Sequence, residues 1–184
     1  MFVWLFSAFW RADHEGAFFV TTPLVRAISA ALMLVAFWLA SAALLRKPAV
    51  LLTADTVLAS RGAITGILRI TRHPFLWALV IWASVHMLNN ADPAGLSLFG
   101  YLLALALFGT LPIDARRAQL IETSRWHEVL RQTSNMPFGA VRRGEQNFWV
   151  ALREVGLLVP LAALVAWGFM LVFHESLIGL PVFY

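Results

Sequence analysis

Long apolar stretches, separated by charged ones, are the dominant pattern of this chain. Four stretches contain no Asp, Glu, Lys or Arg over about the length of a membrane span: residues 27–45, 74–91, 93–113 and 155–173. A helix that crosses the hydrocarbon of a bilayer needs roughly 20 apolar residues. The alternating ten-residue strands of a membrane β-barrel do not occur in this sequence. The pattern predicts an all-α polytopic membrane helical bundle of about four spans, forming one domain over residues 1–184.

The segments between these spans differ in character. Residues 46–72 form a mixed basic connector whose Leu51, Leu52, Val57, Leu58 and Ile64 indicate that part of it lies along the membrane surface. The short Asn-Asn-Ala-Asp-Pro turn at 89–93 makes the second and third spans an antiparallel hairpin. Residues 114–154 form the long polar segment, with an amphipathic surface helix predicted over 114–131 and a turn at 133–138 (TSNMPF).

The N-terminal residues 1–23 are atypical. Residues 1–10 are apolar but too short to span a bilayer. One interpretation is an interfacial aromatic segment, and the other is the end of a longer, truncated helix. His14 follows within a polar break and is expected to be solvated.

Composition supports a membrane protein. The chain is 60% hydrophobic and 13% charged, whereas a soluble domain is about half apolar and a quarter charged. Of the 14 Lys and Arg residues, five lie in 46–72 and seven in 114–153, so 12 fall on one side of a four-span topology. The positive-inside rule makes that side cytoplasmic and the C-terminus periplasmic or lumenal. This placement explains the net charge of +4 without nucleic acid, and the absence of cysteine excludes disulfides and thiolate chemistry.

His86 is the histidine placed deepest in a predicted span. It lies 12 residues after Pro74, roughly 18 Å along a helix, with Trp82 and Asn90 one turn to either side. A histidine at that depth faces protein rather than lipid. It is either a hydrogen-bonded packing residue or a ligand of a metal or haem iron.

His174 and the Arg72-His73 pair are the other candidates. His174 follows the fourth span and reaches the same membrane level as His86, so the two imidazoles could bind one haem iron. Arg72 and His73 begin the second span, roughly 20 Å from His86 along the helix. They form either an interfacial pair at the helix start or a cation pair that binds an anionic or polar cofactor. His127 is expected to be solvated, and no nucleophilic triad, phosphate loop or paired-carboxylate motif occurs.

Several of these stretches together resemble the NnrU family. They are the run GILRITRHPFLWALVIWASVH, the asparagine turn, the run FGYLLALALFGTLPIDARRAQ, the TSNMPF turn, and a last span ending in His174 and Gly179. The family contains bacterial membrane proteins linked by name to denitrification, and plant 15-cis-zeta-carotene isomerase. The resemblance implies haem b in the isomerase branch, a redox or cis–trans isomerase-like role, a hydrophobic small-molecule substrate, and His86 as a haem ligand. Family members carry one or two additional N-terminal helices, which a membrane protein partner could supply here.

Two further functions remain open. Arg-His-Pro before a helical hairpin is also similar to membrane methyltransferases of the isoprenylcysteine carboxyl type, which would imply S-adenosylmethionine as a cofactor near Arg72 and His73. Those enzymes usually have a Glu-Glu pair where this chain has Asp114-Ala115-Arg116-Arg117. A non-enzymatic accessory membrane subunit is the other alternative.

Overall fold

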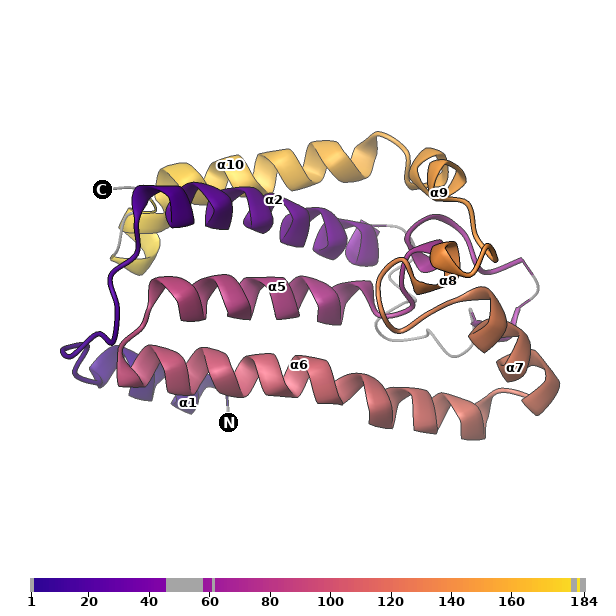
Figure 1. Ribbon diagram of the computed structural model, residues 1–184, viewed down its shortest axis with the longest axis horizontal. Helices are drawn as coiled ribbons and strands as arrows, with labels where there is room; N and C mark the ends of the chain where they lie inside the picture. Colours follow the sequence, from indigo (N-terminus) through magenta and orange to yellow (C-terminus); the bar gives the residue numbers. More distant parts are fainter. Residues whose placement is uncertain (1, 46–57, 61, 180–181, 183–184) are drawn as a thin grey trace.

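A computed structural model describes residues 2–45, 58–60, 62–179 and 182, and over these residues the fold is entirely helical (Figure 1). This confirms the predicted all-α class. The helices named in Figure 1, together with the 3₁₀ turn η1, are α1 (Phe2–Arg11), α2 (Pro23–Leu45), η1 (Gly66–Arg69), α5 (Pro74–Asn89), α6 (Pro93–Leu120), α7 (Thr123–Gln132), α8 (Gly139–Arg142), α9 (Phe148–Val155) and α10 (Leu158–Ile178).

Four long helices lie side by side in the order α10, α2, α5 and α6, each antiparallel to its neighbour (Figure 1). We call the end where α5 begins and α6 ends the basic end, because the predicted basic segments join the helices there. We call the opposite end, where α5 turns into α6, the turn end. The short helices α7, α8 and α9 lie at the basic end, and α1 packs along the first part of α6.

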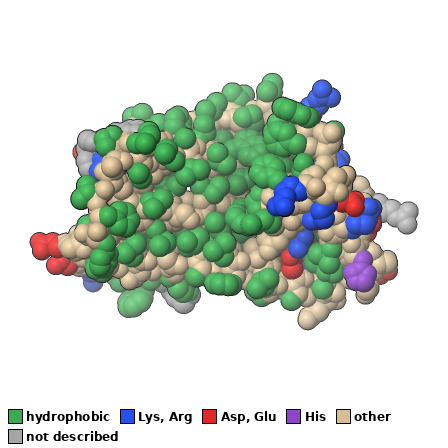
Figure 2. Space-filling model, viewed as in Figure 1, with side chains coloured by type: hydrophobic (Ala, Val, Ile, Leu, Met, Phe, Trp, Pro, Cys, Tyr) green, Lys and Arg blue, Asp and Glu red, His purple; other side chains and the backbone are tan. Residues whose placement is uncertain are grey.

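Three helices, α2, α6 and α10, are long and apolar enough to cross a membrane. The predicted second span, α5, is apolar but has only 16 residues, about 24 Å of helix. It lies between α2 and α6, which cover its two sides. Apolar side chains occupy most of the molecular face in Figure 2, and most of the charged side chains visible on that face lie at the basic end. The chain is therefore built to be embedded in lipid.

Local sequence explains where the hairpin begins and ends. Pro74 and Pro93 each occupy the first turn of a helix, where a missing N–H costs no hydrogen bond. Asp92 caps α6 by accepting a 2.9 Å hydrogen bond from the Gly95 N–H. A Cβ at Gly95 would lie 2.4 Å from the Asn90 carbonyl oxygen, so the turn is closed by the close approach that glycine permits. The predicted antiparallel hairpin is confirmed.

Small residues let α2 and α5 approach closely. Ala42 of α2 and Ala78 of α5 are buried in the same core cluster. Without a hydrophobic driving force between helices in lipid, such small residues allow the backbones to gain van der Waals contact. One core joins α2, α5, α9 and α10, and a second, built around Phe99, joins α5, α6 and α1.

The predicted surface helix over residues 114–131 is wrong in its boundaries. Helix α6 continues through Asp114 to Leu120, and a separate helix, α7, begins at Thr123. The change from apolar to charged residues at 114 marks a change of environment rather than the end of a helix, because charged side chains do not interrupt the backbone hydrogen bonds. The break comes instead at Ile121, whose side chain is buried.

The connector also differs from its prediction. Leu58 and Ile64, expected at the membrane surface, are buried against Leu68, Ile121 and Trp126. These residues form a small core beneath α7, which explains their apolar character without membrane contact. The predicted surface residues Leu51, Leu52 and Val57 lie outside the described residues.

The last span is shifted from its predicted range. Val155 ends α9, Gly156 has a positive φ of +67°, and α10 runs from Leu158 to Ile178. His174 is therefore within the last turns of α10 rather than beyond it. Residues 2–11, predicted to be an apolar segment too short to span, form the helix α1, in which Phe6 and Phe9 pack against the Phe99 core.

Candidate functional site

A partly open cavity of about 160 Å³ lies between α2, α5 and α10 near the turn end. Two of the predicted histidines line this cavity: His86 from α5 and His174 from α10. Its other polar lining residues are Arg26, Ser29, Asn89 and Asn90, and its apolar walls include Met33, Phe37, Trp82 and Leu171. An apolar pocket with a few converging polar groups is the usual form of a small-molecule site.

The imidazole of His86 is held in one tautomer. Its Nδ1 lies 2.8 Å from the Trp82 carbonyl oxygen. A carbonyl oxygen can only accept a hydrogen bond, so Nδ1 carries the proton and donates it. In the neutral ring the proton is therefore absent from Nε2, which has a lone pair. A backbone carbonyl that fixes the tautomer in this way is the usual outer-shell partner of a metal-binding histidine.

Two aromatic rings fix the orientation of His86. Its ring centroid lies 4.5 Å from that of Trp82 and 5.0 Å from that of Phe99. Phe99 in turn contacts Phe9 of α1, with centroids 5.7 Å apart. The half-buried histidine thus faces protein, as its depth in the span predicted.

Neighbouring hydrogen bonds hold the three helices around the cavity. The Asn89 side-chain amide donates to Ser29 Oγ and to the Val85 carbonyl, each at 2.8 Å. Trp167 Nε1 of α10 donates to the Ala30 carbonyl of α2 at 2.8 Å. The sequence reasoning overlooked Arg26, Ser29 and Asn89. Their spacing in the sequence could have indicated them. Ser29 follows Arg26 by three residues and Asn89 follows His86 by three, so the two residues of each pair lie on the same face of a helix.

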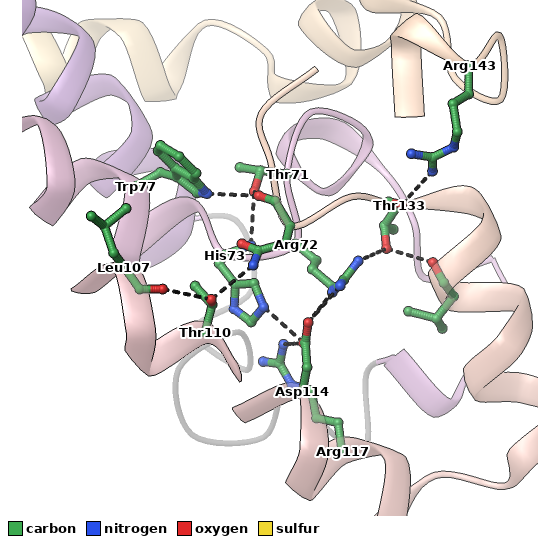
Figure 3. Close-up of polar contacts among 12 residues, drawn as sticks. Thr71, Arg72, His73, Trp77, Leu107, Thr110, Asp114, Arg117, Thr133 and Arg143 are labelled. Atoms are coloured by element: carbon green, nitrogen blue, oxygen red, sulfur yellow. Dashed lines mark hydrogen bonds and ion pairs between the residues drawn. The ribbon is translucent and has the colours of Figure 1, made fainter. Parts of the chain in front are cut away.

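The second group of predicted residues is at the opposite end of α5. Arg72 Nε and Nη2 donate to Asp114 Oδ2 at 2.8 and 2.6 Å, and His73 Nε2 lies 2.9 Å from Asp114 Oδ1 (Figure 3). Arg72 also lies over the Trp126 ring, 5.9 Å from its centroid. The Arg72 and His73 side chains are 10% and 3% exposed. Arg72 therefore does not extend to lipid headgroups, because Asp114 of α6 holds it inside the protein.

The structure thus separates the four candidate residues. His86 and His174 line one cavity, whereas Arg72 and His73 bind Asp114 at the basic end. Burial lowers the pKa of His73, and the nearby Arg72 and Arg117 also disfavour a further positive charge, while Asp114 opposes the change. His73 is therefore neutral at pH 7 and donates its Nε2 proton to the Asp114 carboxylate.

The lowered pKa of His73 predicts a pH dependence of stability. The unfolded chain binds a proton near pH 6.5, whereas the folded chain does not, so the free energy of unfolding should fall as the pH drops below about 6.5. The contribution of one proton is at most about 1.4 kcal/mol per pH unit. Thermal unfolding in detergent between pH 7.5 and 5.5 measures it. The loss should be shallower in His73→Gln, and an equal loss in both proteins would contradict the assignment.

The two remaining histidines behave differently from each other. His127 on α7 is exposed, as predicted. His14, also expected to be solvated, has a side chain 42% exposed, and its Nδ1 lies 3.1 Å from Asp92 Oδ1. This contact links the segment after α1 to the cap of α6.

Among the described residues, no group of three or more His, Cys, Asp and Glu side chains is arranged to hold a metal ion. The cavity therefore offers two imidazoles as possible ligands.

Comparison with known proteins identifies relatives for most of the chain. The sequence model of the family described as NnrU protein matches residues 1–182. The chain is similar to the chloroplastic 15-cis-zeta-carotene isomerases of Arabidopsis thaliana, at 34% identity over 82 residues, and of Zea mays, at 39% over 84 residues. Each match covers 45% of this chain and 22% of the curated relative. No solved structure matches the chain significantly. The family match extends over nearly the whole chain, and the chain therefore belongs to the NnrU family.

Proposed function

We propose that this protein is a haem-b-associated membrane protein with a redox or cis–trans isomerase-like role, and that His86 is an axial ligand of the haem iron. The observation that carries the proposal is the hydrogen bond from His86 Nδ1 to the Trp82 carbonyl. It leaves a lone pair on Nε2 of a histidine that lines the same cavity as His174. Haem iron needs only one or two axial ligands, and a neutral imidazole is a common one. His174 is the proposed second ligand.

The residues around the cavity fit such a group in chemistry. The walls formed by Met33, Phe37 and Leu171 are apolar and suit the face of a porphyrin, and Arg26 brings a positive charge to the lining. The volume, about 160 Å³, is below the roughly 300–1,000 Å³ of sites that enclose a drug-sized ligand. The cavity therefore suits only the part of a haem nearest the iron. The remainder of the porphyrin would lie against exposed apolar helix surface or lipid.

The chain's own residues have defined tasks in this proposal. A bound haem would supply an iron centre that changes oxidation state or exchanges a ligand. Trp82 and Phe99 hold the His86 ring in a fixed plane, and the Trp82 carbonyl keeps Nε2 free of a proton. Asn89 and Trp167 hold α2 against α5 and α10.

The relatives support the choice of reaction class. The matched curated proteins are named as carotene isomerases, so an apolar polyene-like molecule that enters from the bilayer is the proposed substrate class. A redox role in nitrogen-oxide metabolism is the other form of the proposal. We place the basic end in the cytoplasm of a bacterial inner membrane, since Lys and Arg gather on segments 46–72 and 114–154.

No observation favours the methyltransferase alternative in the same way. It needs Arg72 and His73 to bind S-adenosylmethionine, but hydrogen bonds to Asp114 already engage both side chains. In our proposal Arg72 and His73 are structural residues that join the start of α5 to α6 through Asp114.

A haem titration tests the proposal. Hemin added to the protein, purified in mild detergent and freed of haem, should produce a shifted Soret band that saturates at one equivalent. A parallel equilibrium dialysis with S-adenosylmethionine tests the alternative. Hemin absorbance that rises without saturation, as in empty detergent micelles, would refute the haem proposal. Saturable S-adenosylmethionine binding lost in Arg72→Gln would support the methyltransferase instead.

A further inference from the structure

A surface cluster of aromatic rings lies at the basic end, away from the cavity. Phe138 contacts Phe148 with ring centroids 6.1 Å apart, and Phe148 contacts Trp149 at 5.2 Å. Phe138 and Trp149 are nevertheless 45% and 68% exposed, and Met136 is 62% exposed. We call Met136, Phe138, Phe148 and Trp149 the aromatic patch.

The loop that carries the patch is rigidly held. Phe138 N–H donates to the Ile70 carbonyl and Arg72 N–H to the Ser134 carbonyl, both at 2.9 Å. The Asn135 carbonyl accepts hydrogen bonds from Thr71 Oγ1 at 2.7 Å and Trp77 Nε1 at 2.8 Å. Phe138 has φ +62°, and no other described residue except glycine has a positive φ. A bulky residue in this conformation is strained. The contacts of the loop therefore hold the Phe138 ring at the surface in a backbone conformation that is unfavourable by itself.

Two exposed arginines lie one helical turn after residues of the aromatic patch. Arg142 lies one helical turn after Phe138, since its N–H donates to the Phe138 carbonyl at 2.9 Å. Arg153 lies one turn after Trp149 on α9. Both side chains are exposed, and within the described part of the chain neither forms a hydrogen bond or ion pair.

The carboxylates nearest in sequence do not balance these two charges. Glu145 forms a 2.7 Å ion pair with Arg131, and Glu154 forms one of 2.7 Å with Arg69. Arg143, the other arginine here, donates to the Arg131 and Thr133 carbonyls. Among the described residues no acid pairs with Arg142 or Arg153, so both present positive charge beside exposed aromatic rings.

The patch lies where the helices leave the bilayer. The loop docks on residues 70–72, directly before α5, and α9 leads through Gly156 into α10. Leu157 and Leu158, 81% and 64% exposed, continue the apolar surface from α9 toward α10. Tryptophan at this level, with adjacent arginine, is typical of contact with lipid headgroups.

We propose that Arg142, Arg153 and the aromatic patch form a binding site for one anionic phospholipid. The two guanidinium groups bind the phosphate and a second anionic group of the head, and the aromatic rings contact the upper part of the acyl chains. Arginine suits this task because its planar donor array matches phosphate oxygens. The site does not depend on haem or on any activity of the cavity.

Lipid titration followed by native mass spectrometry tests this site in the full-length protein. The wild type should bind phosphatidylglycerol at least tenfold more tightly than phosphatidylcholine. Arg142→Gln/Arg153→Gln should bind phosphatidylglycerol roughly 30-fold more weakly, because each basic residue near an anionic lipid contributes about a fivefold gain in affinity. Its affinity for phosphatidylcholine should not change. Arg142→Lys/Arg153→Lys, which keeps the charge, should retain most of the preference.

Arg11→Gln/Arg116→Gln is the charge-matched control, because it removes two exposed arginines that lie on α1 and α6, outside the patch. It should bind phosphatidylglycerol like the wild type. Equal weakening in this control would overturn the proposal, because it would show that the lipid responds to the overall positive charge of the protein rather than to a specific binding site. If the wild type showed no preference for the anionic lipid, the proposal would also be overturned. The aromatic patch would then be a candidate contact surface for a protein partner. Unchanged helical circular dichroism verifies that each variant is folded.

Discussion

Replacing Asp114 with alanine is expected to lower the free energy of unfolding by about 3 kcal/mol. The Asp114 carboxylate accepts hydrogen bonds from Arg72 and His73, whose side chains are 10% and 3% exposed. Removal of the carboxylate leaves the Arg72 guanidinium buried without its counter-charge, and breaking a buried pair in this way costs about 3–5 kcal/mol. The lower value applies because Asp114 itself is 18% exposed. Chemical or thermal unfolding in detergent measures the change.

Glu122→Ala is the matched control for this experiment. Glu122 is an exposed acid at the same end of the molecule, at the cap of α7. Its removal should change the free energy of unfolding by less than about 0.5 kcal/mol. A small effect of Asp114→Ala would mean that the Arg72 and His73 side chains reach water or lipid. The cluster in Figure 3 would then not hold α5 to α6.

Replacing His86 with alanine is expected to abolish the haem spectrum. In the proposed site His86 supplies the axial nitrogen, and the Trp82 carbonyl and two aromatic rings fix that nitrogen in place. Alanine removes the ligand without a charge change, so the helix should persist. His174→Ala is expected to retain haem with the spectrum of an iron that has lost one strong axial ligand.

His127→Ala provides the control for the histidine series. His127 is exposed on α7, at the basic end and remote from the cavity. Its spectrum should match that of the wild type in band position and intensity per protein. Equal spectra in His86→Ala and His127→Ala would refute His86 as a ligand, whatever the wild type binds.

The apolar stretches were sufficient to predict the membrane bundle and its hairpin. A run of about 20 apolar residues has few stable alternatives to a spanning helix. The same reasoning failed at residue 114, where charge marks the edge of the apolar region but α6 continues to Leu120. Helix ends depend on caps and buried contacts such as that of Ile121, which composition does not reveal.

The site was predictable in part for a geometric reason. Counting residues along two helices that both run from the basic end to the turn end places His86 and His174 at one level, and the structure brings both to one cavity. The engagement of Arg72 and His73 by Asp114 was not predictable, since 42 and 41 residues separate the partners. Nor does spacing reveal that Asn135, a residue of a polar loop, accepts hydrogen bonds from Thr71 and Trp77. Such tertiary pairings become visible only when the helices are placed.

The absorption spectrum of the wild-type protein tests the central claim most directly. The protein is purified gently from membranes and measured oxidised and then after reduction with dithionite. We expect a Soret band that shifts on reduction, with sharpened bands in the visible region, at about one haem per chain. A featureless spectrum from protein with intact helical circular dichroism, unchanged by added hemin, would contradict the account of the cavity as a haem site.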